Sequence, residues 1–148
     1  MSDALLEQAI RSHPFTRGLR PDHVARLQKA AQMVQYSSGD KVFETGDPAD
    51  RFYLIRSGVI ELAVASNNPP RAVQTLSEGT VLGWSWAFDR QKWQFDAKAI
   101  TPIRAIEVDG AALLKECELD HEFGYLLMRR LAEVMADRLH AVRKEVRT

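Results

Sequence analysis

Residues 39–62 read GDKVFETGDPADRFYLIRSGVIEL and carry the strongest fold signal in the chain. Short runs rich in β-branched and aromatic residues (KVFE, RFYLIR and VIEL) alternate with Gly-Asp and Ser-Gly pairs. Such runs are typical of strands, and glycine is common where a turn requires a positive φ. The segment therefore predicts short strands that are joined by tight turns.

The same alternation of strand-like runs and turn residues continues over residues 35–108. Regularly spaced short strands favour an antiparallel sandwich or barrel. Within VIELAVA, the side chains of Ile60, Leu62 and Val64 should share one face of a strand, because successive side chains in a strand point to opposite faces. The middle of the chain is therefore predicted to be a β domain.

Both ends of the chain are predicted to be helical, over 2–34 and 109–148. At the start, one helix is expected to break at His13-Pro14, and a second to open at Pro21 and run to Val34. At the end, Asp109 is expected to cap a short helical turn. Asp120 is expected to cap a long helix that reaches about Val146.

Two apolar stripes follow the long C-terminal helix. One stripe begins at Phe123 and continues through Leu127, Leu131 and Val134. The other repeats at alternating spacings of four and three, the pattern of a coiled-coil seam. This dimer seam comprises Met128, Ala132, Met135, Leu139, Val142 and Val146. We expect one stripe to pack on the β domain and the other to contact a partner, with core packing of both as the alternative.

Composition limits the functional classes. The chain has 148 residues, 45% of them hydrophobic, and its 20 basic and 20 acidic residues cancel. A single domain over 1–148 with no bulk preference for nucleic acids or anionic membranes is predicted. Cys117 is the only cysteine, so no internal disulfide can form. No transmembrane run or secretory signal is recognisable, and a cytoplasmic protein without a metal or cofactor is expected.

The segment 39–62 resembles the signature of cyclic nucleotide-binding domains of the Crp–Fnr superfamily, and the likeness extends over nearly the whole chain. The matching residues are Gly39, Gly46, Asp47, Phe52, Tyr53, Ile55, Gly58 and Val59. The resemblance implies an α+β, mainly β fold: an eight-stranded antiparallel jelly-roll β-barrel flanked by N-terminal helices and one long C-terminal helix. In this family that helix often forms a dimer interface.

The family binds its ligand with a phosphate-binding cassette of the pattern F-G-E, a small apolar run, then P-R-A-A-T. Its Glu holds the ribose 2′-hydroxyl and its Arg pairs with the cyclic phosphate. When the family glycine is aligned with Gly83, Trp84 occupies the Glu position and Trp93 the Arg position. An indole offers one neutral donor, whereas a guanidinium gives a phosphate two charge-assisted hydrogen bonds. The resemblance therefore implies a degenerate cassette.

Three interpretations of the tryptophan cluster stay open. The indoles could fill the old pocket and leave a ligand-free interaction domain, or they could line a remodelled pocket for an unknown small ligand. A cyclic nucleotide could also bind through Arg71, Arg90 and backbone amides. The candidate pocket residues are Leu82, Gly83, Trp84, Ser85, Trp86, Trp93, Gln94, Phe95, Arg90 and Arg71.

An enzyme is not expected. The stretch Gly83-Trp84-Ser85-Trp86-Ala87 approaches the G-x-S-x-G motif of hydrolases, but no helical periodicity follows Ser85. The four histidines show no metal-ligand spacing and are expected on exposed helix faces. No catalytic residue is therefore assigned.

The expected function is that of a stand-alone regulatory or sensor domain. It would form a homodimer through the C-terminal helix and bind a protein or a non-standard small ligand. Transcription factors of the superfamily continue into a helix-turn-helix domain, which is absent before Thr148, so no DNA binding is expected of this chain. The alternatives are a cAMP- or cGMP-binding domain with non-standard contacts and a truncated transcription regulator.

Overall fold

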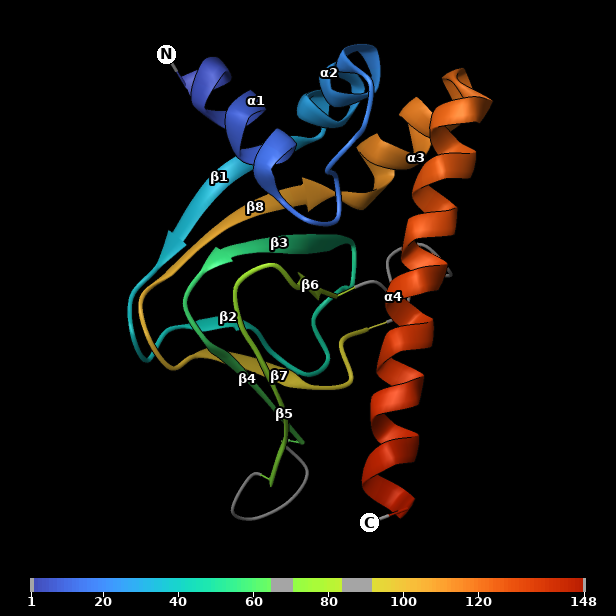
Figure 1. Ribbon diagram of the computed structural model, residues 1–148. Helices are drawn as coiled ribbons and strands as arrows, with labels where there is room; N and C mark the ends of the chain where they lie inside the picture. Colours follow the sequence, from blue (N-terminus) through green and yellow to red (C-terminus); the bar gives the residue numbers. More distant parts are fainter. Residues whose placement is uncertain (1, 65–70, 84–91, 148) are drawn as a thin grey trace.

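The computed structural model describes residues 2–64, 71–83 and 92–147, and side chains over 3–64, 71–83 and 92–140. Helices lie at both ends of the chain and strands in the middle (Figure 1). The helices are α1 (Ser2–Ser12), α2 (Pro21–Lys29), α3 (Gly110–Leu119) and α4 (His121–Arg147). The strands are β1 (Ala31–Tyr36), β2 (Lys41–Phe43), β3 (Arg51–Ser57), β4 (Ile60–Val64), β5 (Arg71–Leu76), β6 (Val81–Leu82), β7 (Asp96–Ala99) and β8 (Ile103–Asp109).

The described strands form two four-stranded sheets, in the orders β1-β8-β3-β6 and β2-β7-β4-β5. Every pairing is antiparallel. Strands from opposite ends of the β region lie side by side, as β1 and β8 do, so the chain curls back on itself (Figure 1). The predicted eight-stranded, mainly β fold flanked by helices is confirmed.

Two hydrophobic clusters hold the fold together. The first joins the helices to one sheet and includes Ile10, Leu27 and Phe123, which are fully buried. The second lies among residues of both sheets and includes Ile60, Leu62 and Trp93. Of the three residues predicted to share one face of β4, Ile60 and Leu62 are buried and Val64 is half-buried. Alternation of side chains along the strands separates the two clusters.

The predicted extent of the second helix was wrong at its C-terminal end. α2 stops at Lys29, and Ala31–Tyr36 form strand β1 instead of the end of a helix. The apolar residues of 30–34 fit a helical repeat, but Ala31 pairs with Val108 and the whole segment follows β8 in register. Tertiary pairing outweighed a weak local preference. The β region therefore starts at residue 31 instead of 35.

Both predicted caps at the C-terminal end are confirmed. The carboxylate of Asp109 accepts a hydrogen bond from the Ala112 backbone N–H (3.0 Å), and Asp120 accepts one from Phe123 (3.1 Å). α4 then runs along one side of the molecule (Figure 1). The stripe that begins at Phe123 is buried against the first cluster, as expected for core packing. No described helix, α4 included, is long and apolar enough to cross a membrane.

Candidate functional site

The position aligned with the cassette arginine is occupied by a buried indole. Trp93 is 6% exposed and stacks on Phe43, with ring centroids 3.9 Å apart and an interplanar angle of 9°. The ring also covers Gly83, where an added Cβ would approach Trp93 Cη2 to 2.5 Å. Gly83 has a φ of +83°, which an L side chain rarely adopts. The Trp93 indole therefore packs on both Phe43 and Gly83.

The backbone around Trp93 is tied to the turn that follows β2. The Trp93 N–H donates to the Asp47 carbonyl (2.9 Å), and the Gly46 N–H donates back to the Trp93 carbonyl (3.0 Å). Asp96 Oδ1 accepts from the Thr45 N–H at 2.7 Å. This hydrogen bond, opposed by partial burial and helped by Lys41, holds the pKa of Asp96 below its ordinary value. Both the ring and the backbone of Trp93 are therefore held by neighbouring residues.

The other candidate pocket residues differ in burial and do not all lie in the cluster that contains Trp93. Leu82 is buried in the second cluster, whereas Gln94 is exposed and Arg71 is exposed at the start of β5. Strand alternation in the sequence predicts that Phe95 shares the face of Trp93 and Ala97, but this prediction is wrong, because Phe95 is 39% exposed. Strand β7 starts only at Asp96, so strand alternation does not extend to Phe95. Trp84, Ser85, Trp86 and Arg90 lie outside the described residues.

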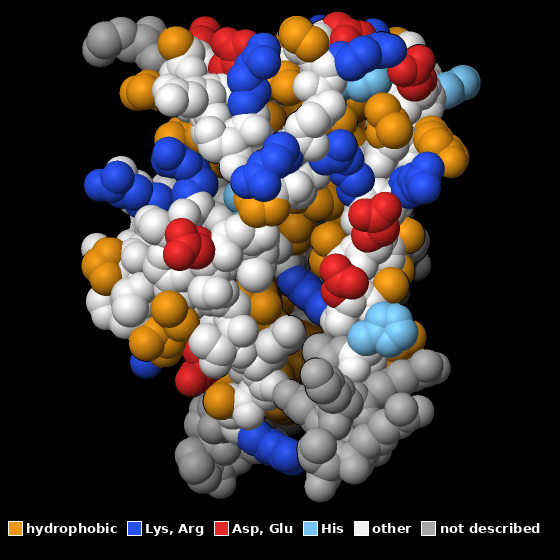
Figure 2. All heavy atoms as spheres, viewed as in Figure 1, with side chains coloured by type: hydrophobic (Ala, Val, Ile, Leu, Met, Phe, Trp, Pro, Cys, Tyr) orange, Lys and Arg blue, Asp and Glu red, His pale blue; other side chains and the backbone are white. Residues whose placement is uncertain are grey.

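A cavity of about 730 Å³ lies on the other side of β6, between α4 and the strands. Figure 2 shows hydrophobic and basic side chains along this hollow. Its apolar lining is contributed by the segment before α2, by β5 and β6, and by α4. The apolar lining residues are Pro14, Phe15, Leu76, Val81, Leu126 and Val134. None of the described residues of 83–95 lines it. No pattern in the sequence predicts this cavity, because it forms between elements far apart in the chain.

Two arginines of α4 contact the walls of this cavity. Arg130 Nη1 donates to the carbonyls of Phe15 (2.7 Å) and Arg17 (2.9 Å), so it ties the N-terminal segment to α4. Arg138 Nη2 donates to the Val81 carbonyl on β6. Burial lowers the pKa of Arg138. The Arg130 guanidinium therefore lies at the wall of the cavity, against the N-terminal segment, and the Arg138 guanidinium lies between α4 and β6.

Only part of the predicted dimer seam is exposed on α4. Leu139 is 55% exposed and Ala132 is exposed, whereas Met128 is half-buried against the first cluster. Met135 is also half-buried, and the side chains of Val142 and Val146 lie outside the described part of the chain. Tyr125, which is 64% exposed, stands three residues before Met128 and continues the spacing of the seam. Sequence reasoning missed Tyr125 because a tyrosine alone carries no burial signal.

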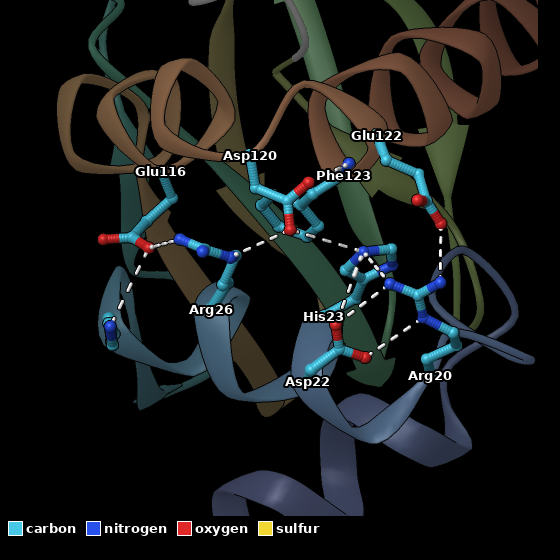
Figure 3. Close-up of polar contacts among 9 residues, drawn as sticks. Arg20, Asp22, His23, Arg26, Glu116, Asp120, Glu122 and Phe123 are labelled. Atoms are coloured by element: carbon cyan, nitrogen blue, oxygen red, sulfur yellow. Dashed lines mark hydrogen bonds and ion pairs between the residues drawn. The ribbon is translucent and has the colours of Figure 1, made fainter.

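A second polar cluster joins α2 to the α3–α4 junction, and we call it the helix clamp (Figure 3). Arg26 pairs with Glu116 (2.9 Å) and with Asp120 (3.2 Å). His23 is fully buried and its Nε2 lies 3.7 Å from Asp120 Oδ2. Arg20 pairs with Glu122 at 2.7 Å and with Asp22 at 3.0 Å. The prediction that the histidines are exposed was therefore wrong for His23, and also for His13, which is 4% exposed.

The helix clamp resembles a metal site only in part. Asp22, His23 and Asp120 bring possible ligand atoms within 4.8 Å of one another. However, Arg20 Nη2 lies 3.1 Å from His23 Nε2, the nitrogen that faces the carboxylates. The Phe123 backbone N–H, together with Arg26 and His23, holds the pKa of Asp120 below its ordinary value. The arginines already compensate the carboxylates, so the cluster acts as an ion-pair connection between helices.

Comparisons with known proteins agree with this architecture. The sequence profile of the cyclic nucleotide-binding domain matches residues 33–120, more than half of the chain. The chain is 30% identical over 117 residues to the CRP-like cAMP-activated global transcriptional regulator of Mycobacterium tuberculosis, covering 78% of this chain and 52% of the regulator. It is 33% identical over 132 residues to Glutaminase 1 of Bradyrhizobium diazoefficiens, covering 85% of this chain and 20% of the glutaminase.

A solved structure shows the same fold at lower identity. The crystal structure of a cyclic nucleotide-binding domain from Methylobacillus flagellatus KT superposes with a TM-score of 0.80 at 16% identity, covering 97% of this chain and 82% of that one. The chain spans between a fifth and about half of the length of the two sequence relatives. The match to the family profile and the shared fold therefore place this chain in the cyclic nucleotide-binding domain family.

Proposed function

We propose that this chain is a regulatory domain whose phosphate-binding cassette no longer holds a cyclic nucleotide, and that it acts by dimerisation and through another partner or ligand. The observation that carries the proposal is the Trp93 indole, which stands at the aligned arginine position and packs between Phe43 and Gly83. A cyclic phosphate placed there would have to displace a stacked aromatic ring.

The energetic argument supports the same conclusion. Hydrogen bonds to a charged group contribute about 1.5–3 kcal/mol, and the loss of the arginine removes this contribution at the phosphate. Trp84 at the glutamate position removes a second contact, with the ribose. The name of the M. tuberculosis relative states activation by cAMP, but the whole-protein activity of that regulator concerns a chain about one and a half times as long. The family fold is thus retained here while its usual ligand contacts are replaced.

A titration with cyclic nucleotides tests the proposal. We expect that neither cAMP nor cGMP, added to about 1 mM, changes the melting temperature or the tryptophan fluorescence. A ligand with a Kd of about 10 μM would stabilise the folded chain by about 2.7 kcal/mol at that concentration. A cyclic nucleotide-binding domain that carries the family Glu and Arg serves as the positive control. A saturable shift at micromolar nucleotide would contradict the proposal.

The dimer part of the proposal depends on the exposed stripe of α4. Tyr125 and Leu139 are large apolar side chains that the protomer leaves more than half exposed, and they share the heptad spacing with Ala132. A second copy of the chain presents the same stripe, so two α4 helices can pack on each other through a two-fold axis. Removal of these side chains from water would stabilise the pair.

The substitution Leu139→Glu tests the seam. We expect it to convert a dimer into a monomer in light scattering at micromolar protein, because the interface would have to bury an unpaired carboxylate. His140→Glu places the same side chain on the neighbouring exposed position, off the stripe, and should remain dimeric. A wild-type monomer, or a Leu139→Glu variant that stays dimeric, would remove the seam from the proposal.

A further inference from the structure

The cavity beside α4 lies apart from the Gly83–Trp93 packing, and it contains a charged group whose described partner is neutral. We propose that this cavity binds a small amphipathic monoanion, with its charged group on Arg138 and its apolar body against the N-terminal segment and β6. This inference goes beyond the proposed function. Anion binding in the cavity neither requires nor excludes the loss of cyclic nucleotide binding at Trp93.

Arg138 supplies the positive charge. Its guanidinium is partly buried between α4 and β6, and burial lowers its pKa, although an arginine remains protonated at neutral pH. Its partner among the described residues is the Val81 carbonyl, and no carboxylate pairs with it there. Arg26 differs, since two carboxylates hold it in the helix clamp. A guanidinium has five donors, so Arg138 keeps donors for an anion.

The walls suit an apolar body. A volume of about 730 Å³ falls within the range of sites for small ligands, about 300–1,000 Å³. Phe15, Val81 and Val134 contribute apolar surface to the lining. Arg130 holds the carbonyl of Phe15 at 2.7 Å, so the aromatic wall is attached to α4 before any ligand arrives. A preformed apolar space next to a cation matches an amphipathic anion.

The charges on the rim select for a single negative charge. Glu133 and Asp137 line the same cavity from α4, and both side chains are exposed. Arg129 and Arg130 also line it, so with Arg138 the lining carries three positive and two negative side chains, a net charge of +1 that suits one negative charge in the ligand. The two carboxylates repel additional negative charge in the ligand, and they do so more strongly for dianions or nucleotide polyphosphates. Thr75 adds a hydroxyl that can donate to a carboxylate or sulfonate. A carboxylate or sulfonate on an aromatic or aliphatic body therefore fits best.

Two fluorescent probes of nearly equal shape test this assignment. 8-Anilinonaphthalene-1-sulfonate carries the anion, and N-phenyl-1-naphthylamine has the same aromatic body without it. We expect saturable 1:1 binding of the sulfonate to the folded wild-type protein. Arg138→Gln should weaken the sulfonate about tenfold or more and leave the neutral probe within about twofold, because only the charge-assisted contact is lost.

Control variants separate a local effect from a general one. Arg104→Gln removes the same charge from an exposed position on β8 and should leave both probes unchanged. Thr75→Trp fills the cavity from an exposed strand position and should abolish binding of both probes, which keeps the test valid if Arg138→Gln does not fold. A cooperative melt for each variant excludes probe binding to a molten state.

Three results would overturn the inference: no saturable binding of the sulfonate, equal affinity of the sulfonate for Arg138→Gln and wild type, or an equal loss of both probes in that variant. The cyclic nucleotide titration does not affect this outcome, so the inference and the proposed function can fail separately.

Discussion

The two sides of strand β6 differ in how they use space. Leu82 belongs to the cluster shared by both sheets, where Trp93 and Phe43 stack and the Gly83 backbone touches an indole ring. Val81, the preceding residue, faces the opposite cluster and lines the cavity beside α4. One step along a strand therefore separates a filled region from a hollow one.

The residues that maintain the β-roll fold are therefore different from those that decide whether space for a ligand remains beside β6. The turns and inward-facing side chains of the roll resemble those of the family. In the proposed function, by contrast, Trp93 takes the position of the family's phosphate contact. Space remains on the other side of β6, where Phe15, Val81 and side chains of α4, including Arg138, line the cavity. Substitutions on the two sides of β6 measure how tightly one side is packed relative to the other.

Trp93→Ala should produce the largest effect. Removal of a buried tryptophan typically costs about 3–5 kcal/mol in unfolding free energy, because the packing contacts are lost and a cavity remains. Leu126→Ala, at a half-buried position that already borders the hollow, should cost only about 1 kcal/mol for its smaller buried area. Urea denaturation measures both. Similar costs for the two variants would erase the distinction between the filled and the hollow side.

Gly83→Ala should destabilise by about 3 kcal/mol, the sum of a left-handed backbone cost and an overpacking cost. Gly46 provides the matched control: its φ is +94°, similar to the +83° of Gly83, but an added Cβ there meets nothing within 4 Å. Gly46→Ala should therefore cost only the backbone part, about 1–2 kcal/mol.

A double-mutant cycle isolates the contact with the indole. In the Trp93→Ala background the ring that a Cβ on Gly83 would meet is gone, so Gly83→Ala should cost no more than Gly46→Ala. An unchanged cost of Gly83→Ala in that background would show that Trp93 does not press on Gly83, and the filled side would lose its main evidence.

The fold could be predicted from the sequence where local chemistry decides the structure. Asp109 and Asp120 cap helices as expected, and the alternation in β4 places Ile60 and Leu62 inside. Ala31–Tyr36 could not be assigned, because their strand depends on pairing with β8, a distant part of the chain where Ala31 pairs with Val108 and Tyr36 with Ile103. Local propensity is a weak guide wherever a distant partner decides.

The candidate site was predictable to a smaller extent. Alignment on Gly83 predicts Trp93 as a pocket residue, and this stays a prediction; only the structure reveals its stack on Phe43. The burial of His23 depends on side chains from α2 and α4 that meet in space, and the cavity at Arg138 depends on three separate segments. Neither leaves a pattern in the sequence, since both arise from packing between elements.

The smallest expected effect concerns Asp96, which fastens the turn opposite Trp93. The Thr45 backbone N–H holds the pKa of this carboxyl below its ordinary value, so the folded state favours the charged form. Its contribution is complete at pH values above the unfolded pKa, about 3.9, and it is lost as the pH falls through the lower folded pKa. Asp96→Asn should cost about 1 kcal/mol at pH 7, and the difference from wild type should shrink between pH 4 and pH 2.

Urea denaturation of wild type and Asp96→Asn across this pH range measures the effect. Asp40→Asn is the control. The Asp40 carboxylate accepts a hydrogen bond from the Ser37 N–H, in a turn away from Trp93. If the Asp96→Asn difference persists at pH 2, the side chain acts through its shape and not its charge. If the difference follows the predicted pH dependence, and tryptophan fluorescence changes over the same range, the charge of Asp96 helps to maintain the packing around Trp93. The cavity side contains no comparable carboxylate anchor to the β roll among the described residues, because its α4 acids, Glu133 and Asp137, are exposed on the rim.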